Sequence, residues 1–159
     1  PALPAPPRGP VVLLLHEDDL HAESLSLAGL DVRRVIGLSC PEARSPLGAA
    51  PIVQRFVAGA LEDGLNRAAR HFGVPAERVT LGDVPELLAH DVVVTPEAPV
   101  GWLADRLSPY PFHPLRRAWD SACWPLGARG FFALRAHIPQ LCAELIGQRQ
   151  ALGRGPKSL

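Results

Sequence analysis

The densest group of ionisable side chains in the 159-residue sequence follows an apolar run at residues 11–15 and comprises His16, Glu17, Asp18, Asp19 and His21. Imidazole and carboxylate groups are common metal ligands and common acids and bases. A zinc-binding helix places its two histidines four residues apart, whereas these two are five apart and would lie about 140° apart around a helix. We therefore favour a solvated loop at a strand end, with one carboxylate capping the next helix, over a metal site.

A second polar group follows the β-branched run in the segment 91–100, DVVVTPEAPV, which leads into a helix-like stretch, GWLADRL. A buried parallel strand is a continuous apolar run, and open α/β sheets bind ligands just beyond the carboxyl ends of such strands. The alternative is a loop that only turns the chain from strand to helix. We expect the two strand ends to line one crevice, with these candidate cofactor-binding residues: His16, Glu17, Asp18, Thr95, Glu97, Trp102 and Arg106. We assign none of them a catalytic role or a metal.

The elements that position these residues alternate between strand and helix. Apolar runs predict strands at 11–15, 32–38, 78–81, 92–95 and 115–119. Apolar residues at three- and four-residue steps, or a capping pattern, predict helices at 52–72, 84–90, 101–107 and 130–147. The alternation indicates right-handed βαβ units, so we expect a three-layer α/β/α fold with a mostly parallel sheet, in which the strands at 11–15, 32–38 and 92–95 are neighbours.

Several residues predict local features of the helices. Gly59 and Gly64 lie inside the helix at 52–72 and each cost about 1 kcal/mol against Ala, so this helix depends on packing and can use them for close approach. Asp83 and Glu86 have the spacing of a capping box. Pro139 should kink or restart the last helix. The inward-facing set of that helix is expected to be Phe131, Phe132, Leu134, Ile138, Leu141, Leu145 and Ile146.

Two tryptophans and three cysteines carry less specific signals. Arg116 and Arg117 beside Trp119 and Trp124 could bind an anion or stack on a planar ring, but we favour core filling for both tryptophans. Cys123 has no basic partner at a diagnostic spacing and is expected to be a buried thiol. The three cysteines are odd in number and contain no CxxC pair, so they predict neither a disulfide framework nor a zinc ribbon, which fits a reducing cytoplasm.

The composition predicts one globular domain at 11–147, with a disordered Pro-rich tail at 1–10 and a flexible tail at 148–159. Sixteen basic and sixteen acidic side chains cancel, so we expect no strong standalone nucleic-acid binding, and any such contact would have to be a local patch. No apolar run is long enough to span a membrane, and the first residues lack the pattern of a signal peptide.

The common catalytic and phosphate-binding motifs, GxSxG, the P-loop and GxGxxG, are absent. Three segments nevertheless resemble the N-terminal α/β domain of the DNA photolyase and cryptochrome family. They are VVVTPEAPVGWLADRL at 92–107, RRAWD at 116–120 and WPLGARGFFALRAHIPQL at 124–141. The apolar opening at 11–15 and the helix at 52–72 lie in compatible places, so the likeness spans most of residues 11–147.

This resemblance implies a Rossmann-like domain that binds an antenna chromophore, such as a folate or flavin derivative, beside a large helical FAD domain. The sequence is too short to include that second domain, so FAD is expected only on a partner, an FAD-binding photolyase-like protein. Glu97 departs from what a phosphate or DNA site would need, since its charge repels both. Two alternatives stay open: a small nucleotide-binding enzyme that uses Thr95, Glu97 and the carboxylates at 17–19, and a purely structural interaction domain.

Overall fold

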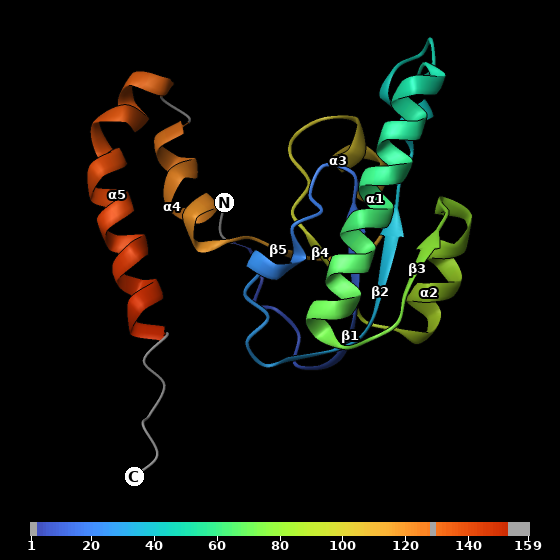
Figure 1. The fold of residues 1–159 in the computed structure, drawn as a ribbon, viewed down its shortest axis with the longest axis horizontal. Helices are drawn as coiled ribbons and strands as arrows, with labels where there is room; N and C mark the ends of the chain where they lie inside the picture. Colours follow the sequence, from blue (N-terminus) through green and yellow to red (C-terminus); the bar gives the residue numbers. More distant parts are fainter. Residues whose placement is uncertain (1–2, 128–129, 153–159) are drawn as a thin grey trace. The chain divides into compact units, whose positions relative to one another are not determined.

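The computed structural model describes residues 3–127 and 130–152, and the chain divides into two compact units, 1–115 and 116–159 (Figure 1). The division lies inside the range 11–147, which the sequence predicts as one domain. Residues 3–8 form no regular secondary structure, and the first strand begins at Gly9. Within the described ranges, no helix is both long and apolar enough to cross a membrane.

The first unit is built on a five-stranded, entirely parallel sheet. Its strands are β1 (Gly9–His16), β2 (Leu30–Leu38), β3 (Ala76–Val79), β4 (Val93–Pro96) and β5 (His113–Leu115). Their spatial order is β3-β2-β1-β4-β5 (Figure 1). The prediction that the apolar runs at 11–15, 32–38 and 92–95 are adjacent parallel strands is therefore confirmed.

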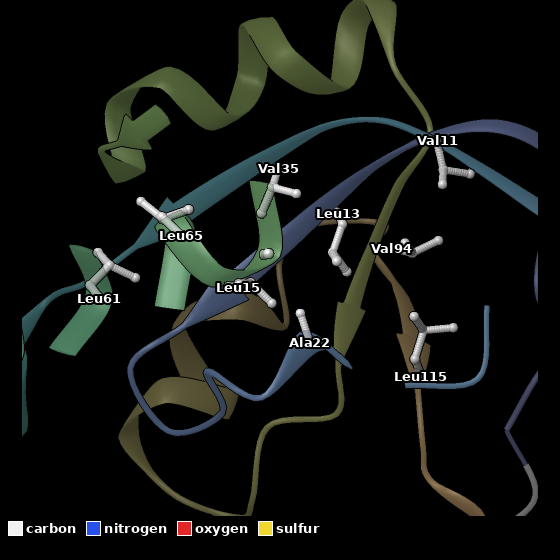
Figure 2. Close-up of a cluster of buried hydrophobic side chains, with 10 residues drawn as sticks. Val11, Leu13, Leu15, Ala22, Val35, Leu61, Leu65, Val94 and Leu115 are labelled. Carbon is white, nitrogen blue, oxygen red and sulfur yellow. The ribbon is translucent and has the colours of Figure 1, made fainter. Parts of the chain in front are cut away.

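Helices cover both faces of this sheet. They are α1 (Pro51–Phe72), α2 (Val84–His90) and α3 (Trp102–Leu107), together with short 3-10 turns at Ala22–Ser24, Pro41–Arg44 and Leu81–Asp83. Alternate residues of β1 point to opposite faces. Leu13 lies in a buried cluster with Leu61 and Leu65 of α1 (Figure 2), and Leu14 lies in a second cluster with Leu103 of α3. The expected three-layer α/β/α architecture is confirmed.

Helix α1 begins and ends as its sequence predicts. Pro51 occupies its first turn, where no backbone N–H is needed, and Gly73 ends it in a left-handed conformation with φ of 67°. The two internal glycines differ in surroundings. Gly64 is buried against Leu20, whereas Gly59 is exposed. Only Gly64 therefore serves the close approach that the sequence predicts for both.

We expect Gly59→Ala to raise the free energy of unfolding by about 0.5–1 kcal/mol, because Ala is the better helix former. Among the described residues, no atom lies within 4 Å of a Cβ added at Gly59. Gly64→Ala should instead lower the stability, since its Cβ would lie 3.0 Å from the Cβ of Leu20. Urea unfolding of both variants measures the difference, and equal stabilities would contradict the packing described for α1.

Two local expectations are wrong in the first unit. The capping box is formed by Thr80 and Asp83 rather than by Asp83 and Glu86. The Asp83 carboxylate accepts hydrogen bonds from the Thr80 N–H at 2.7 Å and from the Thr80 hydroxyl at 2.8 Å. The carboxylate is thus engaged with Thr80, three residues earlier, and α2 follows without a side-chain cap from Asp83. The last strand covers 113–115 instead of 115–119, because the chain enters a helix at Ala118.

The second unit is a pair of helices, α4 (Ala118–Gly127) and α5 (Phe131–Leu152), which pack against each other. Helix α5 runs through Pro139 without restarting and continues past the expected end at 147. The residues at 148–152, QRQAL, are all good helix formers, which explains this extension into the range predicted as a tail. The remainder of that range, 153–159, lies outside the described residues.

The apolar side chains of this second unit are more exposed than the sequence predicts. Four of the expected inward set are exposed, namely Phe131, Phe132, Ile138 and Ile146. Trp119 and Trp124 are each 41% exposed, so the core-filling interpretation of both is wrong. Cys123 is only partly buried, contrary to expectation. A pair of packed helices buries one side of each helix, which leaves too little interior for so many large apolar residues.

Candidate functional site

The strand order locates the candidate site between β1 and β4. The chain places β1, β2 and β3 in one direction across the sheet and then returns to place β4 and β5 on the other side of β1. At such a reversal the segments that follow the two central strands separate toward opposite faces, and a crevice opens at their carboxyl ends. His16 is the last residue of β1 and Pro96 the last residue of β4, so both lie at this point.

His16 joins the two strand ends. Its side chain is fully buried, and its Nε2 lies 2.9 Å from the carbonyl oxygen of Pro96. Because a carbonyl only accepts, we assign the proton to Nε2, which leaves Nδ1 as an acceptor. Nδ1 has no hydrogen-bond partner among the described residues. The solvated loop expected at this strand end is therefore wrong for His16, which belongs to the interior.

Glu17, the next residue, has a buried side chain that forms an ion pair with the partly exposed Arg44. Its side chain is 1% exposed, and its carboxylate accepts hydrogen bonds from Arg44 Nε at 2.6 Å and from the Cys40 N–H at 3.0 Å. Arg44 also donates to Asp18 at 3.3 Å and lies over the ring of Trp102, 5.5 Å from its centroid. We call these five residues the Arg44 cluster. It connects the ends of β1 and β2 with the beginning of α3.

Sequence reasoning missed Arg44 and Cys40 as members of this site. Their position in the sequence could have identified them, because both follow β2. The carboxyl end of β2 lies at the same edge of the sheet as the carboxyl ends of β1 and β4. Burial, together with the carboxylates of Glu42 and Glu17, raises the pKa of the Cys40 thiol to about 11, although Arg106 lowers it. The thiol is therefore protonated at neutral pH, and it is unsuited to act as a nucleophile.

A cavity of about 180 Å³ lies beside the end of β4. It is lined by Thr95, Pro96, Glu97, Ala98, Ala104, Leu107, Ser108, Tyr110, Phe112 and Pro114. The rings of Tyr110 and Phe112 have centroids 5.5 Å apart. Ligand sites for drug-sized molecules usually measure about 300–1,000 Å³, so this cavity is smaller than a typical ligand site and could not enclose a whole dinucleotide.

The structure thus separates the seven candidate residues instead of gathering them. Thr95 and Glu97 line the cavity, whereas Glu17, Asp18 and Trp102 belong to the Arg44 cluster. The remaining two candidate residues belong to neither group. His16 is the buried link between β1 and β4, and Arg106 is exposed on α3 and acts electrostatically on Cys40.

A larger cavity, of about 420 Å³, lies against α2 and β3. Its Arg34 pairs with Glu77 at 3.0 Å and with Asp91 at 2.6 Å, so the charge of this guanidinium is already neutralised. Asp91 precedes β4, which places this cavity near the beginning of that strand rather than at its carboxyl end. It is therefore the weaker candidate for a ligand site in a sheet of this topology.

The side chains that commonly bind metals do not gather in the described part of the chain. No three His, Cys, Asp or Glu side chains among the described residues come together as a metal site requires.

No family model, no curated protein and no solved structure matches this chain. The geometry at the carboxyl edge of the sheet is therefore the basis for assigning a function.

Proposed function

We propose that the unit 1–115 is a non-catalytic domain that binds a planar ring system in the cavity beside Thr95 and Glu97. The observation that carries the proposal is this cavity, which lies beside the carboxyl end of β4, one of the two strands between which the strand order reverses, and whose lining includes Tyr110 and Phe112. Aromatic walls favour a flat apolar ligand through stacking or edge contacts. The polar residues of its lining, Thr95 and Glu97 among them, would fix its orientation.

The likeness to photolyases supports the same assignment. The segment 92–107, which carries part of that likeness, forms β4 and α3 and supplies several walls of the cavity. We infer a light-related role, in which the domain holds an antenna-type ring, such as a folate or flavin derivative, or docks on a separate FAD-binding photolyase-like protein. The chain contains no glycine-rich phosphate loop, and the Glu97 charge disfavours a triphosphate.

The enzyme alternative has less support. The carboxylate of Glu17 is already engaged by Arg44 and by the Cys40 N–H, so it is poorly placed to act as a general base. The raised pKa of Cys40 disfavours a thiolate mechanism. We therefore expect no ATPase, nuclease or photorepair activity from this chain alone.

Ring binding can be tested by titrating the purified chain into FMN, and separately into a methenyl folate, while ligand fluorescence is recorded. Ala104 lines the cavity from α3, so Ala104→Phe should fill it and weaken binding at least about ten-fold, or 1.4 kcal/mol. Ala89→Phe is the matched control, because Ala89 is exposed on α2 outside this cavity. It should leave the affinity unchanged.

Two outcomes would contradict the proposal. If neither ligand binds to the parent chain, the purely structural alternative is favoured. If Ala104→Phe binds as tightly as Ala89→Phe, the ring occupies another place. ATP hydrolysis that is lost on Glu97→Gln would instead favour the enzyme alternative.

A further inference from the structure

Helix α5 has an apolar face that is exposed. At 3.6 residues per turn, a group of exposed apolar residues of this helix falls within an arc of about 120° around its axis. They are Phe131, Phe132, Pro139, Cys142, Ala143 and Ile146, and we call them the exposed α5 face. A different stripe, formed by Leu134, Leu141 and Leu145, is partly buried, and α4 packs on α5 (Figure 1). Helix α5 therefore has more apolar surface than α4 covers.

The two phenylalanines provide the largest part of this face. Phe131 and Phe132 are 63% and 80% exposed, and their ring centroids are 5.7 Å apart, so they form one continuous surface. A whole aromatic side chain offers about 150–250 Å², so the rings of two copies together would contribute about 400–700 Å². The other apolar residues of the face, with Ile146 57% exposed, bring the total near the roughly 1,000 Å² that a specific interface requires.

The spacing of the bulky residues makes this face complementary to itself. Phe132 and Ile146 each lie seven residues from Pro139, in opposite directions along the chain. A seven-residue step is close to two helical turns, so the three residues lie on one line along the helix. When two such helices cross antiparallel at Pro139, Phe132 of each copy meets Ile146 of the other.

The charge within this arc favours the antiparallel arrangement. Arg135 is exposed and lies between the directions of Phe131 and Ile146 around the helix. In a parallel pair the Arg135 side chains of the two copies would lie opposite each other and repel. In an antiparallel pair that crosses at Pro139 they are separated by about 12 Å along the helix axis, at 1.5 Å per residue.

The opposite side of α5 argues against a membrane surface as the occupant. His137, Gln140 and Glu144 lie there, and no Lys or Arg accompanies them among the described residues. A helix that lies on a membrane surface carries Lys and Arg on its polar face. A second pair of helices is the better match, because two helix pairs together enclose the core of a four-helix bundle.

We propose that the chain forms a homodimer in which the exposed α5 faces of two copies pack antiparallel. The contact is isologous, since the same residues contribute from both copies. Burial of the four phenylalanine rings supplies most of its stability. This association is separate from ring binding by the unit 1–115, and each can fail without the other.

The first test is sedimentation equilibrium of the full chain at about 50 µM, where an interface of this size should give a dimer. Phe132→Glu places a charge within the contact and should raise the dissociation constant at least about ten-fold. His137→Glu is the matched control, because His137 is exposed on the opposite side of the same helix. It should change the dissociation constant by less than about two-fold. Both positions are exposed, so circular dichroism should show the parent helix content in each variant.

Two double variants test the orientation. Phe132→Glu with Ile146→Arg brings opposite charges together only in the antiparallel dimer, because the two positions of one chain are about 21 Å apart along the helix. Phe132→Glu with Ile146→Glu puts like charges in the same places. The first double variant should dimerise at least about five-fold more tightly than the second, and added salt should reduce the difference. Equal dissociation constants would overturn the antiparallel arrangement.

Three other results would overturn the self-association itself. The first is a parent chain that stays monomeric at this concentration and sediments with vesicles of anionic phospholipid, which would assign the face to a membrane. The second is a dimer that Phe132→Glu leaves unchanged, which would place the contact on another surface. The third is a monomer that Phe132→Glu makes less stable to urea, which would mean that the face is covered within the chain.

Discussion

Val93→Asp should abolish folding of the α/β unit. Val93 is 1% exposed in β4, where it pairs with Val12 and packs in the cluster that contains Leu14 and Leu103. A carboxylate there would lose its hydration without gaining a hydrogen-bond donor, or it would have to be neutralised, and either costs several kcal/mol. Domains of this size are usually stable by only about 5–15 kcal/mol. Thermal unfolding followed by circular dichroism should show no cooperative transition.

The control for this substitution is the preceding residue. Val92 is 44% exposed, so Val92→Asp places the same charge one residue earlier, where water can still reach it. Its thermal midpoint should remain close to that of the parent. Arg8→Ala, in the segment before β1, should change stability by less than about 0.5 kcal/mol. Equal midpoints for Val93→Asp and Val92→Asp would show that β4 is not a buried central strand.

Arg44→Gln should lower the free energy of unfolding by about 2–3 kcal/mol. This substitution removes the arginine from the nearly fully buried carboxylate of Glu17, which keeps its hydrogen bond from the Cys40 N–H. Breaking a fully buried pair costs about 3–5 kcal/mol, and the loss here is smaller because the Arg44 side chain is 37% exposed. Urea unfolding at neutral pH provides the measurement.

A double-mutant cycle separates the ion pair from other effects of this substitution. Glu17→Gln keeps an oxygen that can accept from the Cys40 N–H, and it removes the charge that Arg44 neutralises. The double variant Glu17→Gln with Arg44→Gln should therefore be more stable than Arg44→Gln alone. Arg55→Gln is the control for loss of an arginine at an exposed position. Strict additivity in the cycle would mean that the two charges do not interact.

The sheet could be predicted because its strands are simple apolar runs. Residues 11–15, 35–38 and 93–95 are buried, and almost all of them are apolar, while α1 shows the period of a helix with one buried face. Right-handed crossovers then leave few possible topologies. From this the neighbouring positions of the β1 and β4 ends follow.

The side-chain partners at the carboxyl ends of β1 and β2 could not be predicted in the same way. Glu17 and Arg44 are 27 residues apart, and no periodicity relates a strand end to a turn after a different strand. The burial of His16 could not be predicted from the sequence, because a histidine after an apolar run is usually solvated. The exposed face of α5 was mispredicted for a different reason, since an apolar residue signals burial only when enough chain surrounds it.

The central position of β1 has a consequence for how the chain folds during synthesis. One edge of β1 pairs with β2, which begins 14 residues after β1 ends, but the other edge has no partner until β4 is made, and the His16–Pro96 contact joins residues 80 positions apart. Contacts of such long range form slowly, and an open apolar strand edge invites pairing with other chains in the meantime. A ribosome-bound chain would therefore expose a half-built sheet until β4 emerges, and chaperone binding at β1 would protect it during that interval.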